Sequence, residues 1–194
     1  MRASILTVVA LLGLVGTAGQ AAADDLFHPV PAAAGQTPGL ELRVVRYGQG
    51  VHGEMVVEVK NPGTTAATFV SSGLYFLPDA QGDEEAPQRL AIVGGIRAGS
   101  EDAPSDLVSV AAGATRKLRF DVYCIDASRH SPSTAQPYTL ARARLPERTI
   151  LAIHGETRNT MRGVTLRPTP EQASMIQSQV WEARRRAKAR LLGE

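Results

Sequence analysis

The sequence contains a single cysteine, Cys124, and little excess of charge of either sign. One cysteine excludes the internal disulfide framework that small exported domains often use for stability. The 21 lysines and arginines nearly balance the 19 acidic residues, so we expect no nucleic-acid partner. Beyond the N-terminus, no apolar run approaches the ~20 residues that a transmembrane helix needs. The chain is therefore expected to carry no transmembrane segment.

The N-terminal region has the layout of a secretory signal peptide. Arg2 supplies the positive start, residues 5–15 form an apolar stretch, and residues 21–23 end a small-residue stretch before Asp24. The apolar stretch is short for a bilayer span, and no cysteine lies there to carry a lipid anchor. We therefore predict that residues 1–23 are a signal peptide and that the protein is secreted or periplasmic.

Most of the remaining chain has a β-type pattern. Residues 24–38 are rich in alanine, proline and glycine and predict a flexible N-terminal segment. Runs such as 40–44 and 54–60 then alternate apolar and polar residues, which indicates half-buried strands separated by turns. Further strand-like runs cover residues 66–71, 74–77, 89–93, 107–110, 115–125 and 138–143. This pattern favours an immunoglobulin-like antiparallel β-sandwich over residues 39–168.

A helix packed against the sandwich is predicted for residues 169–192. Thr169 supplies an N-cap hydroxyl, a proline follows at the first helical position, and Gln172 completes a capping box. Apolar residues then recur at helical spacing: Ile176, Val180, Ala183 and Ala187. Trp181, beside this apolar stripe, is expected to anchor the helix on the sandwich. Residues 145–157 fit either a short helix or a strand.

Cys124 ends a strand-like run in register with apolar residues. Leu118, Phe120 and Val122 share its face, so the thiol is expected to lie in the core, where free cysteine behaves as a small hydrophobic residue. Exported proteins normally carry cysteines in pairs, so two other states stay open, an intermolecular disulfide and a reactive thiol.

Two short segments resemble the signatures of bacterial thioester-domain surface adhesins. They are Tyr123-Cys124 and the run Ile176-Gln177-Ser178-Gln179-Val180-Trp181. In that family, an aromatic-Cys motif supplies a thiol, and a glutamine in an apolar-Gln-x-x-apolar-Trp motif supplies an acyl carbon. The two condense into an internal thioester that traps an amine on a target surface. The resemblance implies that Cys124 is the thiol and Gln177 the acyl partner.

Two other functions, a Cys-dependent hydrolase and a metal site, have weaker support from sequence motifs. A Cys-dependent hydrolase would pair Cys124 with His130 or His154 as the base, but no family signature surrounds either pair. The spacing Cys124-x-Asp126-x3-His130 offers at most three metal ligands and lacks a paired motif. We therefore predict no metal site, no cofactor and no catalytic residues.

Basic residues gather on the last predicted helix. They suit the C-terminal end of a helix dipole, and they could also dock on an anionic surface such as lipid or cell-wall polymer. The surface-binding candidates are Arg184, Arg185, Arg186, Lys188 and Arg190. The sequence thus favours an exported, non-enzymatic binding or structural module with a protein or cell-envelope partner. Covalent amine capture through a Cys124–Gln177 thioester is the alternative.

Overall fold

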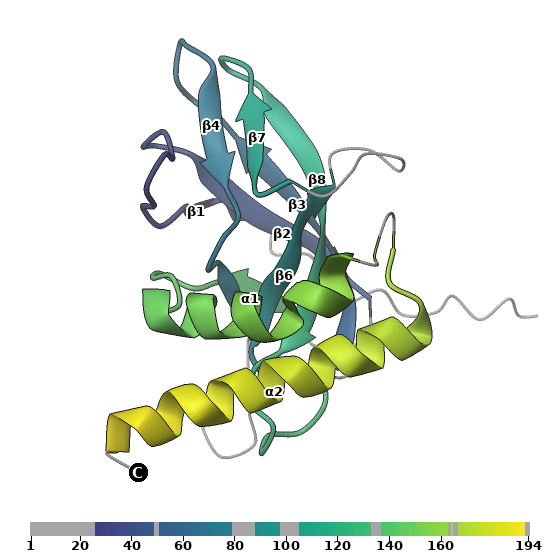
Figure 1. Ribbon diagram of the computed structural model, residues 1–194. Helices are drawn as coiled ribbons and strands as arrows, with labels where there is room; N and C mark the ends of the chain where they lie inside the picture. The colour runs from purple at the N-terminus through teal and green to yellow at the C-terminus, as the bar shows by residue number, and fades with distance from the viewer. Residues whose placement is uncertain are drawn as a thin grey trace, which may run out of the picture.

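The computed structural model describes residues 26–48, 51–78, 88–97, 105–132, 137–162, 164 and 167–192, and the predicted signal peptide lies outside them. Within these ranges, nine β-strands precede two helices (Figure 1). The strands are β1 (His28–Pro29), β2 (Glu41–Tyr47), β3 (His52–Lys60), β4 (Ala67–Val70), β5 (Tyr75–Pro78), β6 (Leu90–Arg97), β7 (Leu107–Val110), β8 (Thr115–Cys124) and β9 (Tyr138–Leu140). The helices are α1 (Glu147–Arg162) and α2 (Pro170–Leu192). The chain is therefore mainly β and ends in a helix, as predicted, and a second helix, α1, precedes it.

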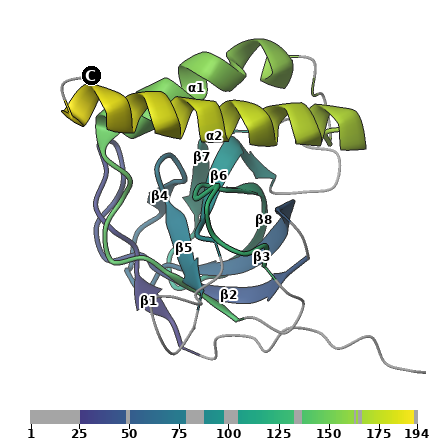
Figure 2. The same ribbon diagram turned by 90° about the horizontal axis from the view of Figure 1, so that it is seen from below.

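Seven strands form one antiparallel sheet in the order β1-β2-β3-β8-β6-β5-β9. The two ends of this sheet approach each other. The ring of Tyr47 in β2 meets the ring of Tyr138 in β9 edge-on, with 5.3 Å between centroids. His28 Nε2 of β1 lies 3.3 Å from Thr139 Oγ1 of β9. The sheet is thus curled into a nearly closed barrel (Figure 2).

An irregularity in β6 helps this sheet to curl. The register between β6 and β8 shifts between Ile92 and Ile96, and such a bulge bends a strand and increases its twist. Gly94 lies in this stretch with a φ of 97°, a conformation that favours glycine. A Cβ added there would lie 2.2 Å from Met161 Cε of α1. The same glycine therefore permits both the bend and the close approach of α1.

The remaining two strands, β4 and β7, form a separate small sheet. Phe69 of β4 stacks on Phe120 of β8, with 6.2 Å between ring centroids and an interplanar angle of 8°. Ala67, Val108 and Val110 are buried in the same apolar cluster. The small sheet therefore covers part of the barrel core. The finer expectation of an immunoglobulin-like sandwich is not confirmed, because the large sheet curls back on itself instead of facing a second sheet of similar size.

Strands β6 and β8 carry apolar side chains on both faces. The inward-facing side chains of these two strands are Leu90, Ile92, Ile96, Leu118, Phe120, Val122 and Cys124, all buried in the barrel core. On the outer face, Tyr123 and Ile125 pack with Ile176 and Val180 of α2 and with Ile153 of α1. Tyr123 shares a face with charged residues in the sequence, yet it is 1 % exposed because the helices cover this side of the barrel.

The helical layer consists of α1 and α2, which lie side by side on the outside of the barrel (Figure 2). The capping box predicted for α2 is confirmed. The Thr169 N–H donates to Gln172 Oε1 at 2.9 Å, and the Gln172 N–H donates to Thr169 Oγ1 at 3.3 Å. Residues 145–157, which fitted either a helix or a strand, contain the start of α1.

The N-terminal segment contacts the rest of the fold in its described part, residues 26–38. Its strand β1 pairs with β2. Arg144 Nε donates to Pro31 O at 3.0 Å and to Ala32 O at 3.1 Å. The N-terminal segment was expected to be flexible over residues 24–38, but its described part is bound to β2 and to Arg144. These contacts use backbone groups, which a composition rich in alanine, proline and glycine does not reveal.

Candidate functional site

Cys124 is the last residue of β8, and its side chain lies in the barrel core. The thiol is free and fully buried, as its shared face with Leu118, Phe120 and Val122 predicts. Burial, with a smaller contribution from the Asp126 carboxylate, raises the pKa of the Cys124 thiol to about 12. Very little thiolate is therefore present at neutral pH, which argues against Cys124 as a nucleophile in this state.

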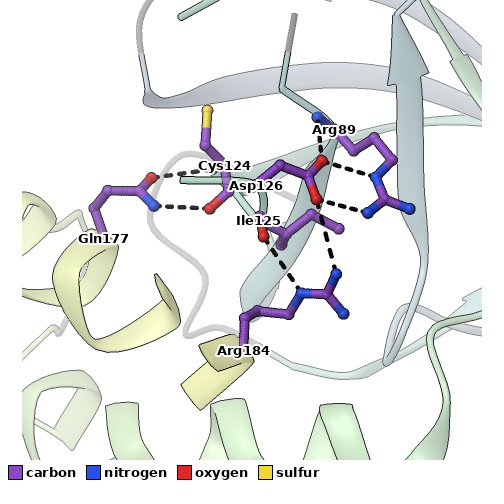
Figure 3. Close-up of polar contacts among 6 residues, drawn as sticks. All are labelled: Arg89, Cys124, Ile125, Asp126, Gln177 and Arg184. Carbon is purple, nitrogen blue, oxygen red and sulfur yellow. Dashed lines mark hydrogen bonds and ion pairs between the residues drawn. The ribbon is translucent and has the colours of Figure 1, made fainter. Parts of the chain in front are cut away.

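Gln177 of α2 lies directly beside Cys124 and is 3 % exposed (Figure 3). Its Nε2 donates to Cys124 O at 2.8 Å, and its Oε1 accepts from the Cys124 N–H at 3.0 Å. The same N–H also donates to Val51 O at 2.8 Å. Figure 3 shows the Cys124 sulfur pointing away from the Gln177 amide. The two candidate thioester residues are thus brought together through the backbone of Cys124.

Directly after β8, Asp126 links the barrel to α2 (Figure 3). Arg89 makes a two-pronged contact with it, Nε to Oδ2 at 2.7 Å and Nη2 to Oδ1 at 2.6 Å. Arg184 of α2 lies farther away, with Nη2 3.8 Å from Asp126 Oδ1. Burial opposes the negative charge of Asp126, but the hydrogen bonds and charge of Arg89 outweigh it, so the pKa of Asp126 lies below its usual value. Asp126 is therefore a charged carboxylate that Arg89 largely neutralises.

A hollow of about 870 Å³ opens between the loop after β8 and the second half of α2. We call it the basic hollow, and the residues that define it are Arg89, Asp126, Ser128, Trp181, Arg184, Arg185 and Lys188. Among the described residues, four cationic side chains and one carboxylate line it. Trp181 supplies part of an apolar wall and also packs against the barrel core. The volume is within the range of ~300–1,000 Å³ typical of ligand-binding clefts.

The predicted surface-binding residues do not share one surface. Those that line the basic hollow are Arg184, Arg185 and Lys188. Arg186 lies on the other side, where it contacts Glu156 of α1 at 2.9 Å and Glu182 at 2.8 Å. Arg190 lies in the last turns of α2. The five residues separate because consecutive positions on an α-helix are rotated by about 100°.

The other candidate chemistry finds little geometric support. Within the described ranges, Cys124 makes no hydrogen bond or ion pair with His130 or His154. His154 instead lines a different hollow, beside Gly94 of β6. No group of three or more His, Cys, Asp or Glu side chains in the described part of the chain could hold a metal ion.

The ion pair between Arg89 and Asp126 was not predicted from the sequence, where Asp126 was considered only as a metal ligand beside Cys124 and His130. Asp126 fits an ordinary turn former, and Arg89 simply precedes a strand-like run. In the fold, Leu90 pairs with Cys124 in antiparallel register, so the residues just outside the two strands meet. The only signal in the sequence was that two residues of opposite charge flank two strand-like runs. The sequence does not show that these two runs, β6 and β8, are neighbours in the sheet.

Comparison with known proteins adds no assignment. No family model matches the chain, and no curated protein or solved structure is significantly similar to it. Among the described residues, neither helix is long and apolar enough to cross a membrane. Function therefore has to be inferred from the geometry of the hollow and of the Cys124–Gln177 contact.

Replacing Cys124 with alanine is expected to reduce the loss of stability at alkaline pH. The thiol pKa is about 12 in the folded protein against an ordinary value of 9.0. Below the ordinary value both states keep the proton; above it the unfolded chain loses the proton first, so stability falls as pH rises toward the folded pKa. Between pH 8 and 10.5 the native protein should lose about 2 kcal/mol more than the Cys124→Ala variant.

Urea unfolding followed by circular dichroism at pH 8, 9 and 10.5 measures this difference. Tyr47 and Tyr138 also have pKa values raised, chiefly by burial and to a smaller extent by the charge of Cys124. Burial is the same in both proteins, so the larger part of their effect cancels in the comparison. The same pH dependence in both proteins would show that the Cys124 thiol is not the source.

Proposed function

We propose that the protein is an exported, non-enzymatic binding module that presents the basic hollow to an anionic partner of the cell envelope. The nearly closed barrel and its helices supply a rigid scaffold, the same role that immunoglobulin-like domains perform for their binding surfaces. The signal-like N-terminus supports export. Protein recovered from the periplasm or medium of a Gram-negative host should begin at Asp24, and full-length chain confined to the cytoplasm would contradict this.

The observation that carries the proposal is the charge of the basic hollow. Its lining has four cations against one carboxylate among the described residues, and Asp126 is already bonded by Arg89. Lys188 is exposed at the wall and makes no ion pair with a described residue. A concave surface with uncompensated positive charge attracts anions and raises their local concentration.

Binding to anionic probes tests the proposal. The probes are vesicles of phosphatidylglycerol and soluble polyphosphate, with phosphatidylcholine vesicles as the neutral reference. We expect the protein to bind at least one anionic probe, and more weakly as salt is raised. Lys188→Gln should weaken this binding, whereas Lys117→Gln, which removes an exposed lysine from β8, should weaken it less. Failure to bind either probe at low salt, or equal effects of the two variants, would overturn the proposal.

The contact between Cys124 and Gln177 supports a second candidate, covalent amine capture. The Cys124 sulfur would bond to the Gln177 amide carbon, and the amide nitrogen would leave as ammonia after taking up the thiol proton. An amine on a target would then attack the acyl carbon, forming an amide and releasing the thiol. The pair is already adjacent and buried where α2 packs on the end of β8, so a thioester there would be shielded from water. Formation requires the thiol to turn toward the amide.

Intact mass measurement tests this candidate. A thioester lowers the mass of the chain by one ammonia molecule, and methylamine then adds its own mass to the opened site. Cys124→Ser and Gln177→Ala should each abolish both changes. An unmodified native mass together with no methylamine adduct would exclude amine capture by this route.

A further inference from the structure

Two of the four cations in the basic hollow are already neutralised by carboxylates. Arg89 holds Asp126 through two side-chain hydrogen bonds of 2.6 and 2.7 Å. Arg185 forms an ion pair with Glu182, three residues before it on α2. Arg186 shares this carboxylate but has a second one, Glu156, so the four groups together carry no net charge. These two pairs contribute no net charge, so the ligand-attracting charge must come from the other two cations.

Arg184 and Lys188 are those remaining cations. Arg184 Nη2 lies 3.8 Å from Asp126 Oδ1, a carboxylate that already accepts three hydrogen bonds from Arg89. Arg184 Nε donates to the neutral Ile125 carbonyl at 3.3 Å. Burial and then the charge of Arg89 lower the pKa of Arg184, and the opposing effect of Asp126 is smaller than either, so Asp126 compensates the positive charge of Arg184 only in part. Lys188 follows four residues later and therefore lies on the same face of α2, one turn along. Together the two leave about two uncompensated positive charges on one wall.

We infer that the basic hollow binds a phosphate-type dianion, a phosphate monoester or a diphosphate group, between Arg184 and Lys188. This inference rests on the proposed function and names the chemical group that the hollow recognises. Two positive charges match a dianion, whereas a single carboxylate would leave one of them unneutralised. The planar guanidinium of Arg184 suits two oxygens of one phosphate, and the Lys188 ammonium adds a point charge.

Two neutral residues line the hollow: one can bind the same ligand, and the other can report its presence. The Ser128 hydroxyl, exposed on the loop across from α2, can donate a further hydrogen bond to a phosphate oxygen. Trp181 Nε1 is buried and has no hydrogen-bond partner in the described part of the chain. The Trp181 ring forms part of the wall of the hollow and packs against the barrel core. Trp181 is also the sole tryptophan, so its fluorescence reports occupancy.

The test is a titration of the purified protein with inorganic pyrophosphate at ionic strength held constant with sodium chloride. A second arm uses a short-chain, water-soluble phosphatidic acid, which presents the same group as a lipid headgroup. Trp181 emission and calorimetric heat are both followed. We expect saturable binding with one site per chain, and about 10-fold or greater weakening in Arg184→Gln and in Lys188→Gln.

Arg186→Gln is the matched control, because Arg186 pairs with Glu156 and Glu182 and does not line the hollow. It should change affinity by less than about twofold. Lys188 is exposed, so its variant should fold normally and keeps the test valid if Arg184→Gln is destabilised.

Each outcome either identifies the source of the phosphate group, a soluble compound or a lipid headgroup, or rejects the site. Binding of pyrophosphate supports the site and indicates a soluble phosphorylated ligand. Binding of the phosphatidic acid alone supports the site and indicates a lipid headgroup. Binding of neither, or equal weakening by Lys188→Gln and Arg186→Gln, overturns the inference. In that case, retained binding to polyphosphate or phosphatidylglycerol vesicles would leave the proposed function standing, and its loss would remove both.

Discussion

Replacing Arg144 with methionine is expected to lower the free energy of unfolding by about 4 kcal/mol. Arg144 lies in the loop between β9 and α1, and its side chain is half-buried. Its acceptors are Pro31 O, Ala32 O, Val70 O, Ser72 O and Gln36 Oε1. Burial lowers the pKa of Arg144 to about 10, so the guanidinium stays charged at neutral pH. Methionine would fill similar space but remove this donor from all five acceptors, and Pro31 O would keep Gln36 Nε2 as a donor at 3.0 Å.

The effect should be specific to this arginine. Arg142→Met is the matched control, because Arg142 is exposed and makes no hydrogen bond or ion pair with any described residue; its cost should stay below about 0.5 kcal/mol. Arg144→Lys should be intermediate, since one ammonium cannot span the spread of acceptors that a guanidinium reaches. Urea unfolding measures all three, and a loss under about 1 kcal/mol for Arg144→Met would refute this role.

Local features of the fold followed from sequence patterns. The alternating run ending at Lys60 became β3, which pairs with β2. The capping box at Thr169 formed the start of α2. Such signals are readable because each depends on residues close together in the chain, where side-chain period and backbone hydrogen bonding are linked directly.

The closure of the sheet was not readable in the same way. It depends on which strands meet, for example the contact of Tyr47 with Tyr138 across the ends of the sheet. It also depends on the bulge around Gly94, whose glycine has an ordinary appearance in the sequence. Segment 145–157 was ambiguous because Ile150, Leu151 and Ile153 fit either period. In the fold, α1 buries Ile153 and leaves Leu151 62 % exposed.

The candidate site shows the same division. The strand pattern predicted the burial of Cys124, since it needs only the alternation within β8. The proximity of Cys124 and Gln177 came from a resemblance, because no local pattern links a strand end to a helix so far along the chain. The Arg89–Asp126 pair likewise required the β6–β8 pairing. Non-local pairing therefore builds the basic hollow, and it is the part that a single sequence conceals.

Gln177→Leu is expected to lower the free energy of unfolding by about 3 kcal/mol. Leucine keeps the size and apolar contacts of the side chain but removes both hydrogen bonds to the Cys124 backbone. The Cys124 N–H retains Val51 O as an acceptor, whereas the Cys124 carbonyl loses the Gln177 donor in a buried position. The cost arises mainly from this carbonyl, since a buried polar group without a partner bears its full desolvation penalty.

Gln179→Leu is the matched control, two residues along the same helix. Gln179 Oε1 is buried without a hydrogen-bond partner in the described part of the chain, so removing that amide should cost less than about 0.5 kcal/mol or even stabilise the fold. Urea unfolding compares the two variants, and native-state labelling of Cys124 by a thiol reagent gives a second measure. Gln177→Leu should label faster than the native protein, because α2 would be held less firmly over the end of β8. If the two leucine variants unfold at the same urea concentration and label alike, the paired amide contact contributes nothing, and the docking of α2 must rest on its apolar residues alone.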